Sequence, residues 1–340
     1  MVELTQYHAL SVRLTRIFLK CGCSDRVANI LARNCAAAER DGAHSHGLFR
    51  VPGYVSSLTS NWVDGRAIPL LEDVSPGFLR IDAANGYAIA ALEAGRQMAL
   101  KKAFENGIAI VATRNSHHLG ALSLDVEAFA TEGLVAIALT NSMKSVVPFG
   151  GHSSVYGTNP IAFASPRATG YPLVFDQATS VMAYGDVLIA SQTGRKVDIG
   201  VGVDRHGQPT TDPAAIIDGG SLCAFGGHKG ASISLMIEIL CAALVGGCFS
   251  YEMDIRNTVG AATARTGQTI ILIDPGAGRG QLADFAQRVE ELLQQVLGAG
   301  QARLPGERRH AIREQSLREG IRVSNDMSMT LSAVEKSLGI

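Results

Sequence analysis

The segment Ile108-Ala109-Ile110-Val111-Ala112 is a short apolar run with β-branched residues, and the polar segment 113–118 follows it directly. A run of this length and composition predicts a buried strand that ends where the polar residues begin. Residues 135–140 have the same character, and the mainly polar residues 141–144 follow them. Further short apolar runs predict strands over 161–164, 173–175 and 269–274. The middle of the chain is therefore predicted to form a β-sheet with elaborate loops.

Helical patterns lie on both sides of this region. Apolar residues within 24–38, such as Val27, Ile30 and Leu31, recur at the spacing of an amphipathic helix. Thr5 and Ser24 are candidate N-caps for two helices that open the chain. Further helices are predicted over 88–106, 232–245 and 282–297, and in the polar tail that begins at residue 304.

The order of these elements indicates the fold class. Helices come first, then strands, then helices, without a regular alternation of strand and helix, so a doubly wound parallel sheet is not expected. An α/β fold with a sheet-rich middle fits better. We expect residues 1–112 and 300–340 to pack together as one discontinuous helical domain, and residues 113–299 to form a sheet-rich domain.

Composition excludes several classes of function. The chain has 340 residues, 46% of them apolar, which is ample for a buried core. Its 30 Lys and Arg residues are balanced by 31 Asp and Glu residues, so nucleic acid and anionic membranes are not expected partners. Neither a basic leader nor a run long enough to span a bilayer is found, and we expect a cytoplasmic protein. The six cysteines are scattered, which does not suggest a disulfide framework.

The segment His44-Ser45-His46-Gly47-Leu48-Phe49-Arg50 places two imidazoles, a hydroxyl and a permanent cation at the end of a predicted helix, and Tyr54 follows. An imidazole can transfer a proton near neutral pH, and a guanidinium can hold a carboxylate through two parallel hydrogen bonds. These residue types together suggest chemistry on a small carboxylic acid. The alternative is that the cationic groups merely complement the helix dipole and contact solvent.

Two glycine-rich loops are candidates for nucleotide binding. The loop 274–280 reads G-x-G-x-G after a proline and leads only into a helix and the tail, so it lacks the spacing of a dinucleotide fingerprint and is interpreted as a turn. The loop 226–230 opens a helix and carries Lys229. Because the free N–H groups of a helix start attract anions, this loop is the better candidate for a phosphate, although it also fits a surface helix with a chance lysine.

Five motifs, in order over nearly the whole chain, carry a resemblance to a known family: Ser45-His46-Gly47-x-x-Arg50, Gly157-Thr158-Asn159-Pro160-Ile161-Ala162-Phe163, Phe175-Asp176-x-Ala178-Thr179-Ser180, Gly226-Gly227-His228-Lys229-Gly230 and Leu304-Pro305-Gly306. They resemble the type 2 malate/L-lactate dehydrogenase family. Within it, residues 40–54, 116–118 and 304–309 are most similar to the members that reduce Δ1-piperideine-2-carboxylate and Δ1-pyrroline-2-carboxylate.

This resemblance implies an NAD(P)H-dependent reduction of cyclic imino acids to L-pipecolate or L-proline. It also implies a non-Rossmann NAD(P)-binding fold with a mainly antiparallel central sheet, formed here by 113–299, helical N- and C-terminal segments that carry the substrate and dimer contacts, and a homodimer. NADPH is the expected cofactor, with NADH as the alternative.

The family's functional residues fall on matching positions of this chain. The charge-relay and proton-donor residues fall on Ser45, His46 and Asp186, the substrate-carboxylate arginine on Arg50, and a position near substrate and nicotinamide on Thr158. Arg308 and Arg309 are placed for an adenosine 2′-phosphate, although arginines in a polar tail are often only solvated. The resemblance assigns the cofactor contacts to His118, Leu119, Gly120, Ala121, Leu122, Asp176, Gln177, Ala178, Gly227, His228, Lys229, Pro305, Gly306, Glu307, Arg308 and Arg309.

Three other functions remain open. A 2-hydroxy-acid dehydrogenase of the malate or lactate type would use the same residues on an open-chain substrate. A metal-dependent hydrolase or lyase would need His44, His46 and the pair at 117–118 to converge with Asp125 or Asp186; no paired cysteine clip or H-E-x-x-H motif accompanies them, and we predict no metal. A non-catalytic protein of the same fold would bind NADPH without turnover.

Overall fold

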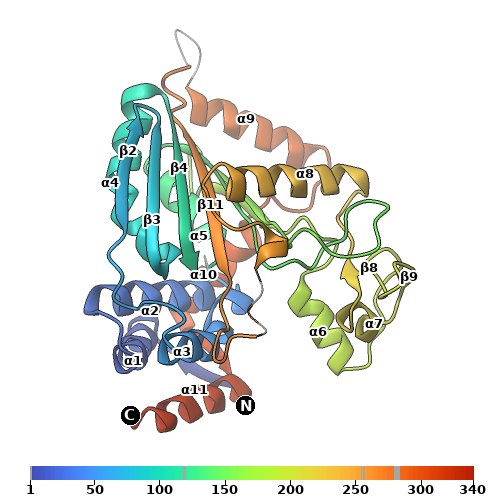
Figure 1. Cartoon of the computed structure of the whole chain (residues 1–340). Helices are drawn as coiled ribbons and strands as arrows, with labels where there is room; N and C mark the ends of the chain where they lie inside the picture. Colours follow the sequence, from blue (N-terminus) through green and yellow to red (C-terminus); the bar gives the residue numbers. More distant parts are fainter. Residues whose placement is uncertain (1, 118–119, 254, 256, 279–283) are drawn as a thin grey trace.

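A seven-stranded sheet lies at the centre of the fold (Figure 1). The computed structural model describes residues 2–117, 120–253, 255, 257–278 and 284–340. The sheet has the strand order β2-β3-β4-β11-β5-β6-β7, in which β3 and β4 run parallel and the other five neighbouring pairs are antiparallel. Its strands are β2 (Leu70–Ser75), β3 (Phe78–Tyr87), β4 (Ile108–His117), β5 (Val135–Thr140), β6 (Ile161–Ser165), β7 (Leu173–Gln177) and β11 (Arg265–Ile273).

The sheet starts earlier in the chain than the sequence predicted. β2 is exposed along its whole length, and therefore shows no burial alternation that would mark it as a strand. With β3, α4 (Ala88–Asn106) and β4, the chain also contains one strand-helix-strand unit with parallel strands, where no such unit was expected. The predicted boundary at residue 112 falls inside β4, which continues through the polar residues to His117 because they pair with β11.

Helices cover both faces of the sheet (Figure 1). On one face α4 and α5 (Leu122–Thr131) bury side chains such as Leu92 and Phe129 against Val111 and Ile270. On the other face α8 (His228–Glu238) and the π-helical turn Ile239–Ala243 pack Ile237 and Cys241 against the sheet. α8 begins at His228, four residues before the predicted start, so the glycine loop opens a helix as predicted.

The two ends of the chain pack together below the sheet. Here β1 (Val2–Thr5) pairs with β12 (Ile321–Ser324), and one apolar core combines α1 (Tyr7–Lys20), α2 (Asp25–Arg40) and α3 (Val51–Thr59) with β12 and α11 (Asn325–Ser337). α10 (Glu307–Glu319) precedes β12. Ser24 caps α2 as predicted, because its hydroxyl accepts from the Val27 N–H. The Thr5 prediction is wrong: Thr5 pairs with Ile321 at the end of β1, and Gln6 is the N-cap of α1.

A smaller unit lies beside the sheet (Figure 1). It contains α6 (Tyr184–Gln192), α7 (Pro213–Ile217) and a three-stranded sheet of β8 (Gly202–Val203), β9 (Pro209–Thr210) and β10 (Ser221–Leu222), around its own apolar core. β11 and α9 (Phe285–Gly298) flank the loop 274–280, of which 279 and 280 lie outside the described residues. The described part is a turn that starts at Asp274, whose carboxylate accepts from the Gly276 N–H.

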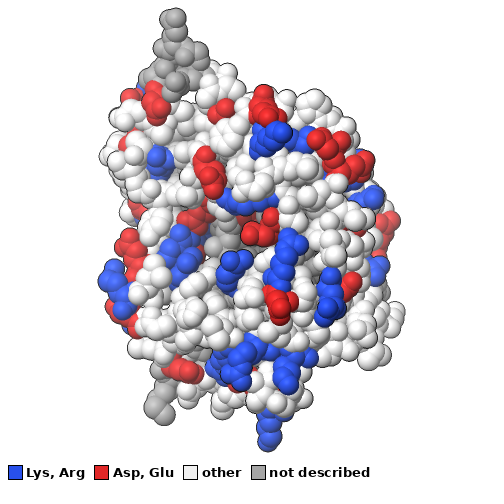
Figure 2. All heavy atoms as spheres, turned by 90° about the vertical axis from the view of Figure 1, so that its left-hand side faces the viewer, with Lys and Arg blue, Asp and Glu red and all other residues white. Residues whose placement is uncertain are grey.

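Surface charge is mixed on the face that Figure 2 shows, where acidic and basic side chains are interspersed over most of the surface. All six cysteines are free thiols. None of the described helices combines the length and the apolar character that a bilayer crossing needs.

Candidate active site

Two short 3-10 turns connect α2 to α3 and present the predicted catalytic residues. They are η1 (His44–His46) and η2 (Leu48–Arg50). The Ser45 hydroxyl lies 3.0 Å from His46 Nδ1, and Arg50 Nε donates to the Ser45 carbonyl over 2.7 Å. The structure therefore brings Ser45, His46 and Arg50 together on one turn of chain, as the sequence predicted.

Glu39, near the end of α2, stabilises this turn through contacts with His44 and Leu48. Its buried carboxylate lies 2.6 Å from His44 Nδ1 and accepts from the Leu48 N–H over 3.0 Å. A Cβ on Gly47 would lie 2.3 Å from Glu39 Oε2, so a side chain at this position would displace the carboxylate. The sequence analysis missed Glu39. The available signal was an acidic residue in the last turn of a helix, where the dipole disfavours negative charge.

We expect Glu39→Ala to destabilise the protein by about 1–3 kcal/mol, because the buried Leu48 N–H loses its acceptor, and to lower kcat/KM as the turn loses its geometry.

The Glu39 carboxylate raises the pKa of His44. The contribution of this pair to stability is thus present below the usual histidine pKa and is lost as pH rises through the raised pKa. Denaturant unfolding should show a larger deficit at pH 6 than at pH 9. Glu39→Gln, which keeps an acceptor for the Leu48 N–H, is the matched control. Equal losses of stability in both variants would contradict the role of Glu39 as that acceptor.

The electrostatic state of His46 differs from the sequence expectation of an ordinary pKa near neutrality. His46 is half-buried, and burial together with the charge of Arg50 lowers its pKa to about 4. Its imidazole is therefore neutral at pH 7 in the substrate-free protein. Asp186 lies in the first turn of α6, in the smaller unit. Its pairing with His46 stays a prediction.

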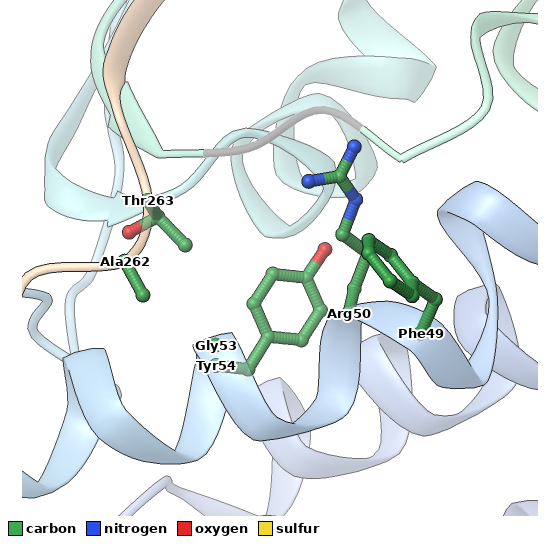
Figure 3. A pocket seen from close by; sticks show the side chains of 6 residues that line it. All are labelled: Phe49, Arg50, Gly53, Tyr54, Ala262 and Thr263. Carbon is green, nitrogen blue, oxygen red and sulfur yellow. The ribbon is translucent and has the colours of Figure 1, made fainter. Parts of the chain in front are cut away.

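A small cavity of about 180 Å³ lies beside this turn, and Figure 3 shows its lining. The guanidinium of Arg50 and the hydroxyl of Tyr54 lie at the same end of the cavity. Among the described residues none accepts a hydrogen bond from Arg50 Nη1 or Nη2, so both nitrogens remain available to a carboxylate. Burial raises the pKa of Tyr54 well above its usual range, which keeps the side chain a neutral phenol.

The opposite wall of this cavity is the segment 262–263, which the sequence analysis missed because no motif marks it. Trp62 Nε1 donates to the Thr263 carbonyl over 2.7 Å, and the Thr263 hydroxyl lies 3.2 Å from His117 Nδ1. His117 Nε2 lies 3.0 Å from Asn85 Oδ1, so both ring nitrogens have partners. Burial and the charge of Arg265 lower the pKa of His117 to about 4. His117 therefore acts here as a neutral support for the wall.

The alternative metal site does not form from the residues that the structure describes. His44 pairs with Glu39 and His117 with Thr263 and Asn85, while Gln268 Nε2 donates to Asp125 over 3.0 Å. Within this part of the chain, no group of three or more His, Cys, Asp or Glu side chains is placed to hold a metal ion.

The predicted cofactor segments converge around the end of β7. Asp176 accepts from the Ser123 N–H over 2.9 Å, which joins β7 to the start of α5 directly after Leu122. Further along the chain, the Thr179 N–H donates to the Thr158 carbonyl over 2.8 Å, and the Phe225 N–H donates to the Thr179 carbonyl over 2.9 Å. The glycine loop 226–230 therefore begins directly after Phe225, the residue that is hydrogen-bonded to Thr179. Predicted contacts His118 and Leu119 lie outside the described residues.

The C-terminal segment that begins at residue 304 also lies close to β7. A Cβ on Gly306 would lie 2.8 Å from the Val174 carbonyl oxygen, so the tail backbone passes close to β7. Burial raises the pKa of Asp176, and the nearby Arg309 opposes that rise. Arg309 Nη1 is buried without a partner among the described residues, whereas Arg308 is exposed. A buried, unpaired guanidinium nitrogen near a helix start suits an anionic ligand such as a dinucleotide phosphate.

Comparisons with known proteins show which proteins this chain resembles. The chain is 54% identical over 319 residues to a Delta(1)-pyrroline-2-carboxylate/Delta(1)-piperideine-2-carboxylate reductase of Pseudomonas syringae pv. tomato, with 94% of this chain and 92% of that protein covered. It is also 54% identical over 311 residues to the Pseudomonas putida protein of the same name, with 92% and 91% covered. The crystal structure of the delta1-piperideine-2-carboxylate reductase from Pseudomonas syringae matches with a TM-score of 0.94 and 52% identity, covering 98% of this chain and 99% of that one.

The match extends over the whole fold. The family model of malate/L-lactate dehydrogenases matches residues 5–332 of this chain. The resemblance that the five sequence motifs carried is therefore confirmed, and so is the α/β fold. On the evidence of the family model, the relatives and the shared structure, the chain belongs to the malate/L-lactate dehydrogenase family.

Proposed function

We propose that this protein reduces cyclic imino acids with a reduced nicotinamide cofactor, converting Δ1-piperideine-2-carboxylate to L-pipecolate and Δ1-pyrroline-2-carboxylate to L-proline. The observation that carries the proposal is the cavity in which Arg50 presents two guanidinium nitrogens, neither of which donates to a described residue, next to the turn of Ser45 and His46. The names of the relatives that are 54% identical support the substrate class.

Arg50 orients the substrate in this proposal. Its planar guanidinium binds the carboxylate through two parallel hydrogen bonds, which fixes the direction of the attached ring as well as its position. The carboxylate also offsets the charge of Arg50, one of the two causes that lower the pKa of His46. Substrate binding should therefore make His46 a better hydrogen-bond acceptor.

His46 guards the proton on the substrate nitrogen. An iminium accepts hydride far more readily than a neutral imine, so the nitrogen must stay protonated until the hydride arrives. The neutral imidazole of His46 accepts a hydrogen bond from the iminium N–H, and Ser45 orients the ring through Nδ1. Asp186 completes the proposed relay as the carboxylate that fixes the tautomer and the ring orientation of His46.

The segments around β7 would hold the cofactor, with Thr158 near the nicotinamide, Asp176 and the start of α5 near the ribose, and Lys229 near the pyrophosphate. When bound, the reduced nicotinamide supplies the hydride. We propose a preference for NADPH, because Arg308 and Arg309 lie at the start of α10 and Arg309 lies near Asp176. We also propose a homodimer. The exposed apolar side chains that support it lie on α8 and its continuation, outside the terminal segments to which the resemblance assigns the dimer contacts: Leu235, Met236, Ile239 and Leu244.

We expect Arg308→Ala to lower the ratio of kcat/KM with NADPH to kcat/KM with NADH by about tenfold, because a charge-assisted hydrogen bond to the 2′-phosphate is lost. Steady-state kinetics with both coenzymes measures this ratio. Arg318→Ala, an exposed arginine later in the same helix, is the control that should leave it unchanged. An unchanged preference in Arg308→Ala would show that this side chain does not contact the phosphate.

The test of the function follows the absorbance of NADPH with cyclic imino acids formed from lysine or ornithine oxidation, next to pyruvate and oxaloacetate. We expect kcat/KM to be highest for an imino acid. Reduction of the oxo acids alone would instead identify a 2-hydroxy-acid dehydrogenase, and cofactor binding without any turnover would identify a binding protein.

A further inference from the structure

Arg313, on α10, is a buried cation that binds two buried carboxylates at once. Its Nε and Nη2 donate to the Asp41 carboxylate over 3.0 Å and 2.5 Å, and its Nη1 and Nη2 donate to the Glu127 carboxylate over 2.6 Å each. All three residues are at most 8% exposed. Asp41 is the C-cap of α2 and Glu127 lies on α5, so one guanidinium joins three helices.

Charge is balanced within this cluster of Arg40, Asp41, Glu127 and Arg313. Arg40 supplies the second cation, because its Nε donates to the Asp41 carboxylate over 2.6 Å. Burial alone would lower the pKa of Arg313, but its hydrogen bonds with Glu127 and Asp41 raise that pKa. Burial would likewise raise the pKa of Glu127, whereas interactions with His310 and Arg313 lower it to about 2. The bond between α10 and α5 is therefore an ion pair at neutral pH.

Each of the three helices is continuous with a part of the proposed active site. The turn 44–50, which carries the residues proposed to bind and protonate the substrate, follows the end of α2. α5 starts where Asp176 accepts from the Ser123 N–H, and α10 starts with the arginines proposed for the cofactor phosphate. α10 lies between α5 and α2 (Figure 1). Arg313 is thus placed between the substrate side and the cofactor side of the site.

The packing around α2 is too close to absorb a change in the position of its neighbours. A Cβ on Gly42, directly after Asp41, would lie 2.9 Å from Ile312 Cδ1 on α10. A Cβ on Gly120, in the chain that enters α5, would lie 2.5 Å from the side-chain oxygen of Asn34 on α2. A change in the spacing of these helices would therefore move the turn 44–50 relative to the cofactor segments.

Stability alone does not explain why charged groups occupy this position. The attraction within a buried ion pair often repays only part of the cost of removing its charges from water, and apolar side chains of similar volume are often as stabilising. A guanidinium that binds carboxylates through paired hydrogen bonds fixes direction as well as distance. What the cluster adds to apolar packing is a fixed geometry between α2, α5 and α10.

We propose that Arg313 is a positioning residue, which fixes the turn 44–50 relative to the cofactor segments and so sets the approach of the nicotinamide to the substrate carbon. This inference rests on the proposed function and on Arg50 and His46 as the residues that meet the substrate. Arg313 acts here through α2 and α5. Because a misplacement of about 1 Å can slow a reaction by about a hundredfold, a change at Arg313 should affect hydride transfer more than binding.

The test is Arg313→Lys, which keeps the positive charge but lacks the planar fork that binds two carboxylates. Single-turnover oxidation of NADPH, with enzyme in excess and a cyclic imino acid at saturation, gives a rate constant for hydride transfer that does not depend on the folded fraction. We expect this rate constant to fall by about tenfold to a hundredfold. The KM for the imino acid and the Kd for NADPH should change little.

Arg167→Lys is the matched control. Arg167 Nε and Nη2 donate to the Glu290 carboxylate over 3.1 Å and 2.9 Å, in the same paired manner, but this ion pair joins the chain after β6 to α9. The control should therefore lose a similar ion pair and keep the wild-type rate constant for hydride transfer.

Each outcome decides between the possibilities. A wild-type rate constant in Arg313→Lys, or a change in KM alone, would overturn the inference while leaving the proposed function intact. If Arg313→Lys does not fold, Asp41→Asn and Glu127→Gln each weaken one arm of the cluster with little change in shape, and each should slow hydride transfer; wild-type rate constants in both would also overturn it. Wild-type protein that reduces neither imino acid would overturn the proposed function, and this inference with it.

Discussion

Replacing His46 with alanine is expected to lower kcat by about a hundred- to ten-thousand-fold, the range in which a positioned acid or base contributes to catalysis. Substrate affinity should change much less, because Arg50 still binds the carboxylate. Steady-state kinetics with a cyclic imino acid separates the two effects. His8→Ala, on the exposed side of α1, is the control. Near wild-type turnover in His46→Ala would exclude His46 from the proton chemistry.

The pH dependence of this defect adds a second criterion. Burial and Arg50 lower the pKa of His46 to about 4, so the neutral imidazole is the form present at every pH well above that value. The ratio of wild-type to His46→Ala kcat/KM, which reports the pKa values of the free enzyme, should therefore be the same at pH 6 and pH 8, since the ionisation of the substrate cancels in the ratio. A ratio that falls steeply between these values would mean that the protonated imidazole is the active form.

Arg50→Lys is expected to raise the KM for the imino acid well above tenfold. A lysine keeps the charge but cannot form two parallel hydrogen bonds with a carboxylate, so the ring loses its fixed direction. The Arg50→Lys variant also lacks the hydrogen bond from Arg50 Nε to the Ser45 carbonyl, which closes the catalytic turn. The matched control is Arg33→Lys, an exposed position on α2. An unchanged KM in Arg50→Lys would place the substrate carboxylate elsewhere.

The elements predicted best were those with a strong local signal. α4 and β5 have the predicted bounds, since a continuous helical pattern or a buried β-rich run marks each of them. β2 and β12 were missed because edge strands or very short strands bury too few residues to leave a pattern. Thr5 illustrates a different limit: its side chain suits an N-cap, but pairing with Ile321, more than three hundred residues away, places it in a strand.

The site residues that were predicted correctly also lie close together in the sequence. Ser45, His46 and Arg50 lie within six residues, so one motif was enough to bring them together. Glu39 supports them through contacts that depend on how α2 ends, and Ala262 reaches the cavity only because of hydrogen bonds to Ser57. The lowered pKa of His46 likewise results from burial, which the sequence does not show.

The most direct test of the proposed site is a crystal structure of the protein with reduced coenzyme and a cyclic carboxylate that cannot be reduced. We expect the carboxylate on Arg50 and the nicotinamide ring facing the cavity, with its reactive carbon about 3–3.5 Å from the substrate carbon that receives the hydride. A nicotinamide ring that lies far from both His46 and Arg50 would contradict the assignment of this site.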